Sequence, residues 1–141
     1  MRLSCHPKSL TKFQTKLKEL TRRSNGKGYQ WVKDQLNRYS RGWLNYYRLA
    51  DMQNNIEKLG GWLNRRIRMY IWKSWKTNRN RYSNLVRCGI NPWKAWQWAN
   101  SRKGYWRVAG SGILQRAVNN QRLIVRGYPS LTEMYKSVHP Y

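Results

Sequence analysis

The stretch IEKLGGWLNRRIRMYIWKSWK, residues 56–76, decides the fold. At about 100° per residue, one face of a helix over this stretch collects apolar and aromatic side chains. That face consists of Ile56, Leu59, Leu63, Ile67, Tyr70 and Ile71. The opposite face mixes cations with large flat side chains, namely Lys58, Trp62, Arg65, Met69, Trp72, Lys73 and Lys76. The pattern predicts a long helix, capped at Asn54 or Asn55, whose second face either packs between two neighbouring elements or meets a nucleic acid.

Two more helical patterns precede this stretch. Residues 10–20 place Leu10, Phe13, Leu17 and Leu20 on one face. The segment 25–28, NGKG, ends this helix, because Asn and Gly accept the left-handed backbone that closes helices. Residues 29–49 carry Val32, Leu36, Tyr39, Trp43 and Tyr46 or Tyr47 at helical spacing. Gly42 interrupts them and marks either a close approach of another backbone or a break between two helices.

Shorter helices are predicted after residue 76. Residues 82–86 form one that Gly89 closes. Asn91 and Pro92 have the residue types of an N-cap and a first helical position, and they open a helix with Trp93, Trp96 and Ala99 inward. Residues 113–118 and a turn before Gly127 follow, and SLTE at 130–133 is a capping box that starts a last helix toward Val138.

These patterns together predict an all-α protein, a small helical bundle of about five to seven helices. Residues 102–107, RKGYWR, lack a helical period and are predicted to form a basic aromatic loop. We expect one domain over 1–141, with a helical bundle up to about residue 90 and a C-terminal helical extension over about 91–141. The sequence contains no repeat of fixed period and no low-complexity linker.

The charge balance points to a polyanionic partner. The chain has 29 Lys and Arg against 5 Asp and Glu, a formal net charge of +24. Such self-repulsion favours nucleic acid as the partner, with an anionic membrane surface second. Nine Trp and ten Tyr against one Phe mean that nearly every ring carries a polar atom. Rings of this kind suit interfaces and stacking on bases as well as a small helical core, and we expect both uses.

Catalytic and metal-binding patterns are not found in the sequence. The five acids, Glu19, Asp34, Asp51, Glu57 and Glu133, are scattered, whereas metal-dependent nucleases and polymerases need converging carboxylates. Cys5, His6, Cys88 and His139 do not have the spacing of a zinc site. There is no glycine-rich phosphate loop, membrane span or secretion signal. We therefore expect a non-enzymatic protein without a cofactor or metal, located inside the cell and not secreted.

Cations and rings interleave most densely at 38–48, 65–76, 79–81 and 102–107. Arg offers forked donors to phosphate, and neighbouring rings add stacking on bases. The predicted RNA-binding residues are Arg38, Arg41, Arg48, Arg65, Arg68, Trp72, Lys73, Lys76, Arg79, Arg81, Arg102, Lys103, Tyr105, Trp106 and Arg107.

Several strings of the sequence resemble a known family. They are HPKSL at 6–10, LN at 36–37 before RGWLNYY at 41–47, RRIRMYIWK at 65–73, WQWANSRKGYWR at 96–107 and ILQRA at 113–117. In this order they resemble the maturase-specific (thumb or X) region at the C-terminal end of group II intron reverse transcriptase/maturases. The resemblance covers nearly the whole chain.

The resemblance implies a helical domain that grips group II intron RNA and assists its folding and splicing. In full-length relatives it also serves as the thumb of an RNA-directed DNA polymerase, after fingers and palm with paired metal-binding aspartates. Those parts and an HNH endonuclease are not found in this sequence, which therefore looks like a free-standing or truncated maturase domain. Intron target DNA and a separate polymerase-domain polypeptide are further implied partners, and the implied location is the bacterial cytoplasm or an organellar matrix.

Two other functions remain open from the sequence. A sequence-indifferent nucleic-acid binder would have the same charge but no preferred RNA fold. A cationic membrane-surface protein would use Trp- and Arg-rich helices on anionic lipid, although the apolar face of residues 56–71 needs a protein core. We favour the RNA-binding protein and expect no membrane partner.

Overall fold

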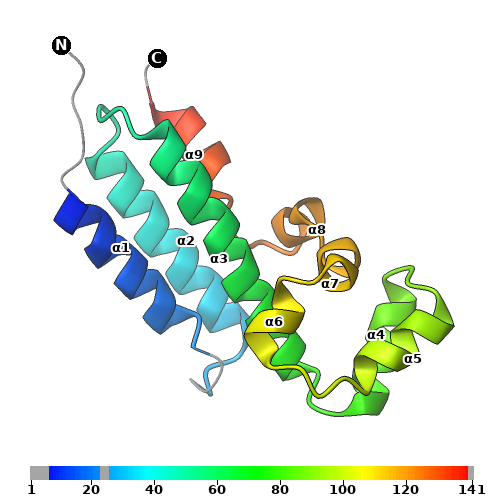
Figure 1. The fold of residues 1–141 in the computed structure, drawn as a ribbon. Helices are drawn as coiled ribbons and strands as arrows, with labels where there is room; N and C mark the ends of the chain where they lie inside the picture. Colours follow the sequence, from blue (N-terminus) through cyan, green and yellow to red (C-terminus); the bar gives the residue numbers. More distant parts are fainter. Residues whose placement is uncertain (1–6, 23–25, 140–141) are drawn as a thin grey trace.

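The computed structural model describes residues 7–22 and 26–139, and this part of the chain is all-α (Figure 1). Cys5, His6 and Asn25, which enter the sequence analysis, lie outside the described residues. The helices are α1 (Pro7–Leu20), α2 (Tyr29–Tyr46), α3 (Gln53–Ser74), α4 (Asn78–Arg87), α5 (Pro92–Ala99), α6 (Tyr105–Ala109), α7 (Gly112–Ala117), α8 (Asn120–Val125) and α9 (Leu131–Val138). The described residues thus contain nine helices, more than the five to seven predicted, because α6, α7 and α8 are very short.

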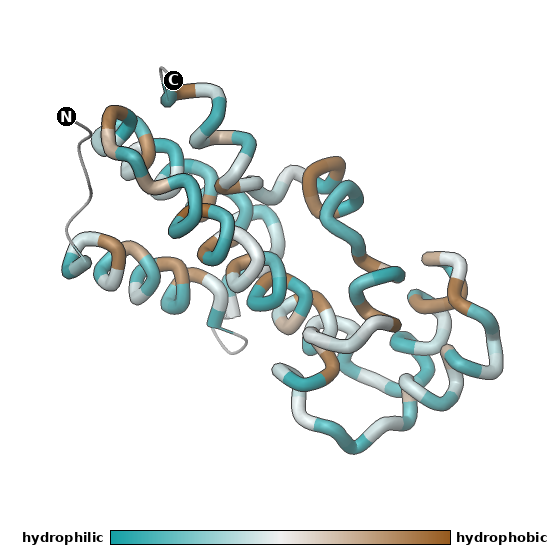
Figure 2. Tube along the Cα trace, turned by 45° about the horizontal axis from the view of Figure 1, so that its top comes forward, coloured by the Kyte–Doolittle hydropathy of each residue, from teal (hydrophilic) through white to brown (hydrophobic). Residues whose placement is uncertain are grey.

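Four helices form the bundle that makes up one half of the molecule. α1, α2 and α3 lie side by side, and α9 packs against α2 and α3 (Figure 1). Apolar and hydrophilic residues alternate along α1, as expected for a helix with one buried face (Figure 2). Phe13, Leu17, Leu36, Ile56 and Leu63 are fully buried between these helices. The predicted apolar faces therefore form the core of the bundle.

The second half of the molecule is built around the C-terminal part of α3. This helix extends beyond the bundle, where α6 packs on it and the α4–α5 hairpin follows it (Figure 1). Met69, Tyr70, Ile71 and Trp72, four consecutive residues, are all buried, so α3 is covered on more than one face here. For the C-terminal part of α3, this confirms the interpretation that the second face packs between neighbouring elements; Lys58 and Lys76 on the same face are exposed.

Most of the predicted helix ends are confirmed. Asn91 Oδ1 accepts a hydrogen bond from the Trp93 amide at 2.9 Å, with Pro92 in the first turn of α5. Gly89 and Gly127 have φ values of +90° and +97°, the left-handed backbone that closes a helix. Ser130 is the N-cap of α9, as predicted. The cap predicted at Asn54 or Asn55 is wrong, because α3 begins at Gln53 with Met52 as its N-cap.

The structure also answers two questions that the sequence raised, the role of Gly42 in α2 and the direction of the tryptophans in α5. α2 is one continuous helix through Gly42, and a Cβ added at Gly42 would meet nothing within 4 Å. Neither the close approach nor the break is therefore present. Trp93 and Trp96 were expected to point inward, but they are exposed, and α5 instead buries Ala95 and Ala99. Small residues let two short helices approach closely, which leaves no room for an indole between them.

The Tyr135 hydroxyl ties α9 to the connection between α2 and α3. It donates to the Ala50 carbonyl oxygen at 2.6 Å and accepts from the Met52 amide at 3.1 Å, in a buried setting. We expect Tyr135→Phe to lower the free energy of unfolding by about 1–3 kcal/mol, because both buried backbone groups lose their partner. Urea denaturation would measure this. A loss no larger than that of Tyr46→Phe, whose ring is exposed, would contradict it.

Candidate nucleic-acid interface

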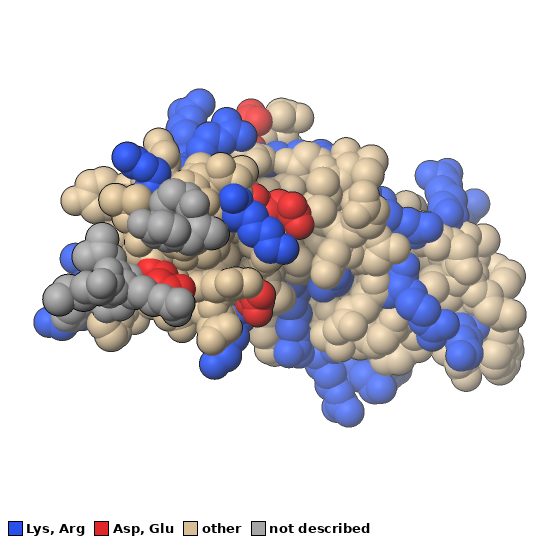
Figure 3. All heavy atoms as spheres, turned by 90° about the horizontal axis from the view of Figure 1, so that it is seen from above, with Lys and Arg blue, Asp and Glu red and all other residues tan. Residues whose placement is uncertain are grey.

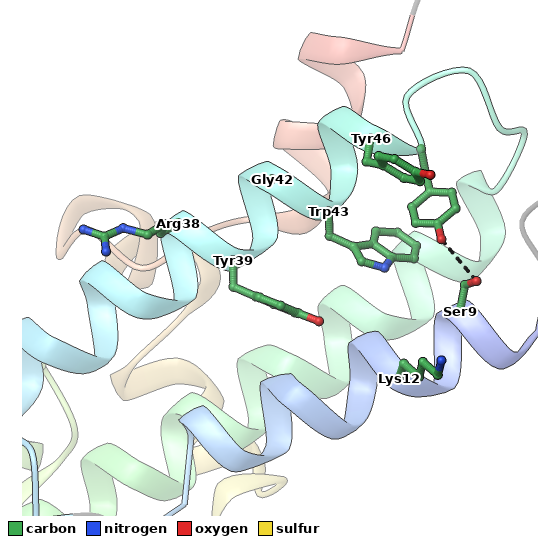
Figure 4. A pocket seen from close by; sticks show the side chains of 8 residues that line it. Ser9, Lys12, Arg38, Tyr39, Gly42, Trp43 and Tyr46 are labelled. Atoms are coloured by element: carbon green, nitrogen blue, oxygen red, sulfur yellow. Dashed lines mark hydrogen bonds between the residues drawn. The ribbon is translucent and has the colours of Figure 1, made fainter.

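A groove lined by aromatic rings runs between α1 and α2. It has a volume of about 570 Å³. Its lining consists of Ser9, Lys12, Arg38, Tyr39, Gly42, Trp43, Tyr46 and Tyr47 (Figure 4). The spacing of three or four residues between the α2 members puts them on one helical face. Tyr39 and Trp43 point from α2 toward α1, so the rings form a row along the groove (Figure 4).

The rings of this groove are fixed by contacts to the bundle. Trp43 stacks on the buried ring of Phe13, with centroids 4.2 Å apart and planes inclined by 7°. Tyr47 donates to Ser9 Oγ at 3.2 Å and lies 4.5 Å from Trp43. Tyr46 packs edge-on against Tyr47 and is 80% exposed. Trp43 and Tyr47 therefore form a rigid inner row, and the exposed ring of Tyr46 beside them can contact a ligand.

The polar groups of the groove include cations and hydroxyl donors. Lys12 lies on the α1 side and is exposed, and Arg38 stands at the other end, pointing away from the rings (Figure 4). Burial raises the pKa of the Tyr39 hydroxyl, and the nearby Glu19 and Tyr47 raise it further. A tyrosine hydroxyl is already protonated at neutral pH at its ordinary pKa, and the raised pKa keeps this one a hydrogen-bond donor in more basic solution as well. Cations and donors beside flat rings fit a ligand with phosphates and bases.

A second groove lies on the other side of α1, toward α3 and α6. Its volume is about 440 Å³, and its lining consists of Thr11, Gln14, Thr15, Lys18, Trp62, Arg66 and Trp106. Arg66 is held in place by donating from Nε to Thr21 Oγ1 at 3.1 Å and from Nη2 to the Lys18 carbonyl oxygen at 3.1 Å. Its guanidinium also lies 6.0 Å from the Trp62 ring centre. A positive charge is thus fixed between α1 and α3 beside exposed polar side chains.

Arg65 docks α6 onto α3. Its Nε and Nη2 donate to the Trp106 carbonyl oxygen at 3.1 and 2.7 Å, and the guanidinium lies 4.0 Å from the centre of the Trp106 ring. A Cβ added at Gly110 would come within 2.6 Å of the Arg65 guanidinium carbon, so a small residue there lets Arg65 reach α6. The predicted loop over 102–107 is therefore partly wrong, because Tyr105–Ala109 is helical. A helix of five residues is too short to show a period in the sequence, and it forms by docking.

Arg65→Ala should lower the free energy of unfolding by about 1–3 kcal/mol, since a charged donor and its ring contact are lost together. Lys76→Ala, which removes an exposed cation two residues after the end of α3, should change the free energy of unfolding by no more than about 0.5 kcal/mol. Thermal melts of the two variants make the comparison. Equal melting temperatures would show that α6 does not depend on Arg65.

Three predicted RNA-binding residues are buried. Arg68 is 6% exposed and donates to the Val118 carbonyl oxygen and to Asn120 Oδ1, both at 2.6 Å, and burial lowers the pKa of its guanidinium. Trp72 is 2% exposed. Arg81 is 9% exposed and lies over the Trp72 ring at 4.7 Å. The prediction that these side chains face RNA is wrong. Arg68 is covered by the segment around Val118 and Asn120, Trp72 lies under Arg81 of α4, and Arg81 in turn packs between Trp72 and Tyr105.

The other predicted residues lie at or near the surface but in separate places. Arg38, Arg41 and Arg48 are exposed on or just after α2. The exposed remainder lies around α4 and the start of α6: Lys76, Arg79, Arg102, Lys103, Trp106 and Arg107. Arg65, Lys73 and Tyr105 are half-buried, with Tyr105 beneath the guanidinium of Arg81 at 5.5 Å. Only Arg38 lines the α1–α2 groove, and only Trp106 lines the second groove.

The sequence analysis missed most residues of the two grooves. Lys12, Lys18 and Arg66 were not singled out, and Tyr39 and Trp43 were assigned only to a helix face with Val32 and Leu36. A usable signal was the type of ring. Tyr and Trp at 39, 43 and 47 carry polar atoms that need a partner or water, so a face of such rings favours a half-exposed groove over a sealed core.

The acidic side chains are confined to one part of the molecule. No Asp or Glu occurs between Glu57 and Glu133 in the sequence. On the face shown in Figure 3, acidic atoms lie in the left half, and the right half, toward α4 and α5, shows only Lys and Arg among the charged residues. The protein is therefore polarised, with an acid-free half that attracts polyanions.

Residues 7–22 and 26–139 contain neither a metal-binding cluster nor a membrane-spanning helix. Within these ranges, no three His, Cys, Asp or Glu side chains come together in a way that could hold a metal ion. None of the helices in the described ranges combines the length and apolarity required to cross a bilayer. The two described grooves offer a ligand hydrogen-bond donors, positive charges and aromatic rings.

Comparison with known proteins identifies the family of the chain. No curated protein matches it. Residues 10–89 match the family model described as the group II intron, maturase-specific domain. The matched residues run from Leu10 in α1 to the turn after α4. They include most of the bundle and most of both groove linings. The matched family is the maturase-specific domain and not the catalytic polymerase domain. The chain belongs to the group II intron maturase-specific domain family.

Proposed function

We propose that this protein binds group II intron RNA and assists its folding and splicing without performing chemistry itself. The observation that carries the proposal is the family match over residues 10–89. Group II introns are ribozymes, so a protein cofactor need only neutralise phosphates and hold RNA helices in place. The net charge of +24 supplies the neutralisation.

The two grooves beside α1 support the same proposal. Each combines at least one cation with rings and hydroxyl or amide groups, and α1 separates them. An RNA strand that follows α1 could place phosphates near Lys12 or Lys18 while an unpaired base stacks on Tyr46. Arg66 and Trp43 are held by the fold, so binding costs little side-chain entropy at these positions.

Competition binding tests the preference for intron RNA. A labelled, folded group II intron transcript bound to the protein is displaced with either the same transcript without label or an unrelated structured RNA of equal length. We expect the unlabelled intron transcript to compete at a concentration at least about tenfold lower than the unrelated RNA. This corresponds to a difference in binding free energy of about 1.4 kcal/mol. Equal competition would make the protein a sequence-indifferent binder. Flotation with anionic vesicles but no RNA binding would favour the membrane-surface function instead.

A pair of charge-matched variants tests whether the α1–α2 groove carries the preference. Lys12→Gln/Arg38→Gln removes two cations of this groove, and Arg126→Gln/Lys136→Gln removes two exposed cations outside the matched residues. Both variants lose equal charge and should lose similar affinity for unrelated RNA. We expect only the groove variant to lose the preference for intron RNA. If both variants keep the preference, the groove is not the recognition site.

The proposal extends to the partners and the location of the protein. Intron target DNA and a separate polymerase-domain polypeptide are proposed as further partners on the basis of the family resemblance. The protein would act where such introns are spliced, in the bacterial cytoplasm or an organellar matrix.

A further inference from the structure

α5 exposes two stacked tryptophans. Trp93 is 66% exposed and Trp96 is 54% exposed. Their ring centres are 5.8 Å apart, and the planes are inclined by only 17°. Leaving two indoles in water forgoes the burial energy of the largest apolar side chains, and adjacent exposed rings commonly mark a binding surface.

The α4–α5 hairpin fixes the direction of this Trp93–Trp96 pair. Ala95 and Ala99 are fully buried on the side of α5 that packs against α4, where Leu85 is also fully buried. Trp93 and Trp96, separated by three residues, lie on the other side of the helix. The Asn91 cap and Pro92 set the first turn, from which Trp93 projects. The pair therefore stands on a preformed helix, and the hairpin does not need it for its own core.

The helix that carries the pair and the segment after it also carry cations. Lys94 lies between the two tryptophans in sequence and is exposed. On the same helix, Trp98 is covered by Lys103, whose Nζ lies 4.7 Å from the ring centre. The hairpin belongs to the acid-free segment between Glu57 and Glu133. A ligand of this surface must therefore tolerate or prefer positive charge while offering a flat apolar face.

We propose that the Trp93–Trp96 pair is a stacking platform for unpaired nucleobases of RNA, with Lys94 close to the backbone phosphates. This inference rests on the proposed function and adds a contact that lies outside residues 10–89, the part that the family model matches. Every base has a flat face that can stack on indole, and every nucleotide of the strand carries a backbone phosphate that Lys can neutralise. An apolar peptide helix would match the rings but not the charge around them.

The test compares oligonucleotides that differ only in their bases. The full chain is titrated with a short oligouridine and with an abasic analogue of the same length and charge. Trp93→Ala/Trp96→Ala should weaken oligouridine binding on the order of 10- to 100-fold and leave binding of the abasic analogue unchanged. A 2-aminopurine placed in the oligonucleotide should be quenched by the wild-type chain and much less by the variant.

Matched variants separate stacking from general apolar contact. Trp93→Phe/Trp96→Phe keeps aromatic faces and should retain most of the oligouridine affinity, whereas Trp93→Leu/Trp96→Leu keeps only apolar bulk and should behave like the alanine variant. Both residues are exposed, so all variants should keep the wild-type melting temperature. The proposal is overturned if the leucine or alanine variant binds oligouridine like wild type. It is also overturned if the pair proves to mediate self-association of the chain in sedimentation with unchanged oligouridine binding.

The failure of this inference can be distinguished from that of the proposed function. Oligouridine contains no intron structure, so its binding does not depend on a preference for intron RNA. If the alanine variant still distinguishes intron from unrelated RNA but no variant affects oligouridine, only the platform is wrong. If the wild-type chain shows no intron preference but the base dependence requires the two rings, the platform stands and the proposed function fails.

Discussion

Trp72→Ala should lower the free energy of unfolding by about 3–5 kcal/mol, the cost of deleting a large core aromatic side chain. Trp72 is only 2% exposed and lies where α3 leaves the four-helix bundle. Its ring contacts Trp75, with centroids 5.9 Å apart, and it lies under the Arg81 guanidinium at 4.7 Å. The substitution therefore opens a cavity and removes the ring on which a nearly buried cation rests.

Trp93→Ala is the matched control for this experiment. It removes the same side chain from an exposed position and should change the free energy of unfolding by no more than about 0.5 kcal/mol. Chemical denaturation with far-UV circular dichroism measures both variants. If the two substitutions had equal effects, or if Trp72→Ala reduced RNA affinity without lowering stability, Trp72 would be a surface residue and the described packing of α3 would be wrong.

RNA binding should fall steeply with salt. If about 6–10 phosphates are neutralised, the affinity should drop about 10³–10⁵-fold between about 50 and 200 mM monovalent salt. The physical reason is that Lys and Arg of a chain with a net charge of +24 displace the counterions condensed on the RNA. Filter binding or fluorescence anisotropy over this range gives the slope of affinity against salt.

The slope should respond to exposed cations and not to the buried ones. Arg107→Gln removes an exposed charge next to Trp106 in sequence and should lower the slope by about one counterion. Arg68→Gln removes a buried guanidinium whose hydrogen bonds are accepted by the Val118 carbonyl oxygen and Asn120 Oδ1, so its main effect should be on stability. A flat salt response of the wild-type chain would remove electrostatics as the basis of binding.

Local signals in the sequence were sufficient for much of the fold. Periodic apolar residues located α1, α2 and α3, because each helix buries one face against its neighbours. Asn91–Pro92, Gly89, Gly127 and the capping box at 130–133 marked helix ends, since capping depends on only a few adjacent residues. The family resemblance was likewise carried by strings that the sequence contains directly.

Features that depend on distant residues could not be predicted. Whether the cation-rich face of α3 meets solvent depends on other elements. Arg68 is covered by Val118 and Asn120, about fifty residues later in the sequence, and Trp72 lies under Arg81 of α4. Trp93 and Trp96 were placed inward by their apolarity, but Ala95 and Ala99 take the contact with α4. The helix over Tyr105–Ala109 is joined to α3 by hydrogen bonds from Arg65, a residue of another element.

The candidate site shows the same division. The presence of cations and rings was clear from composition, and Arg38 and Trp106 were among the predicted residues that line a groove. The pairing of α1 with α2 on one side and with α3 on the other decides which rings line grooves. That pairing is a tertiary property, so Lys12 and Arg66 could be identified only from the structure.

Splicing of a group II intron transcript at limiting magnesium, with and without the protein, tests the central claim most directly. Low magnesium leaves RNA phosphates poorly neutralised, so a cation-rich protein that holds the folded RNA should restore splicing. We predict faster splicing with saturating wild-type protein, a smaller gain with Lys12→Gln/Arg38→Gln, and a full gain with the charge-matched Arg126→Gln/Lys136→Gln. An unchanged splicing rate at protein concentrations that saturate the RNA would contradict the account.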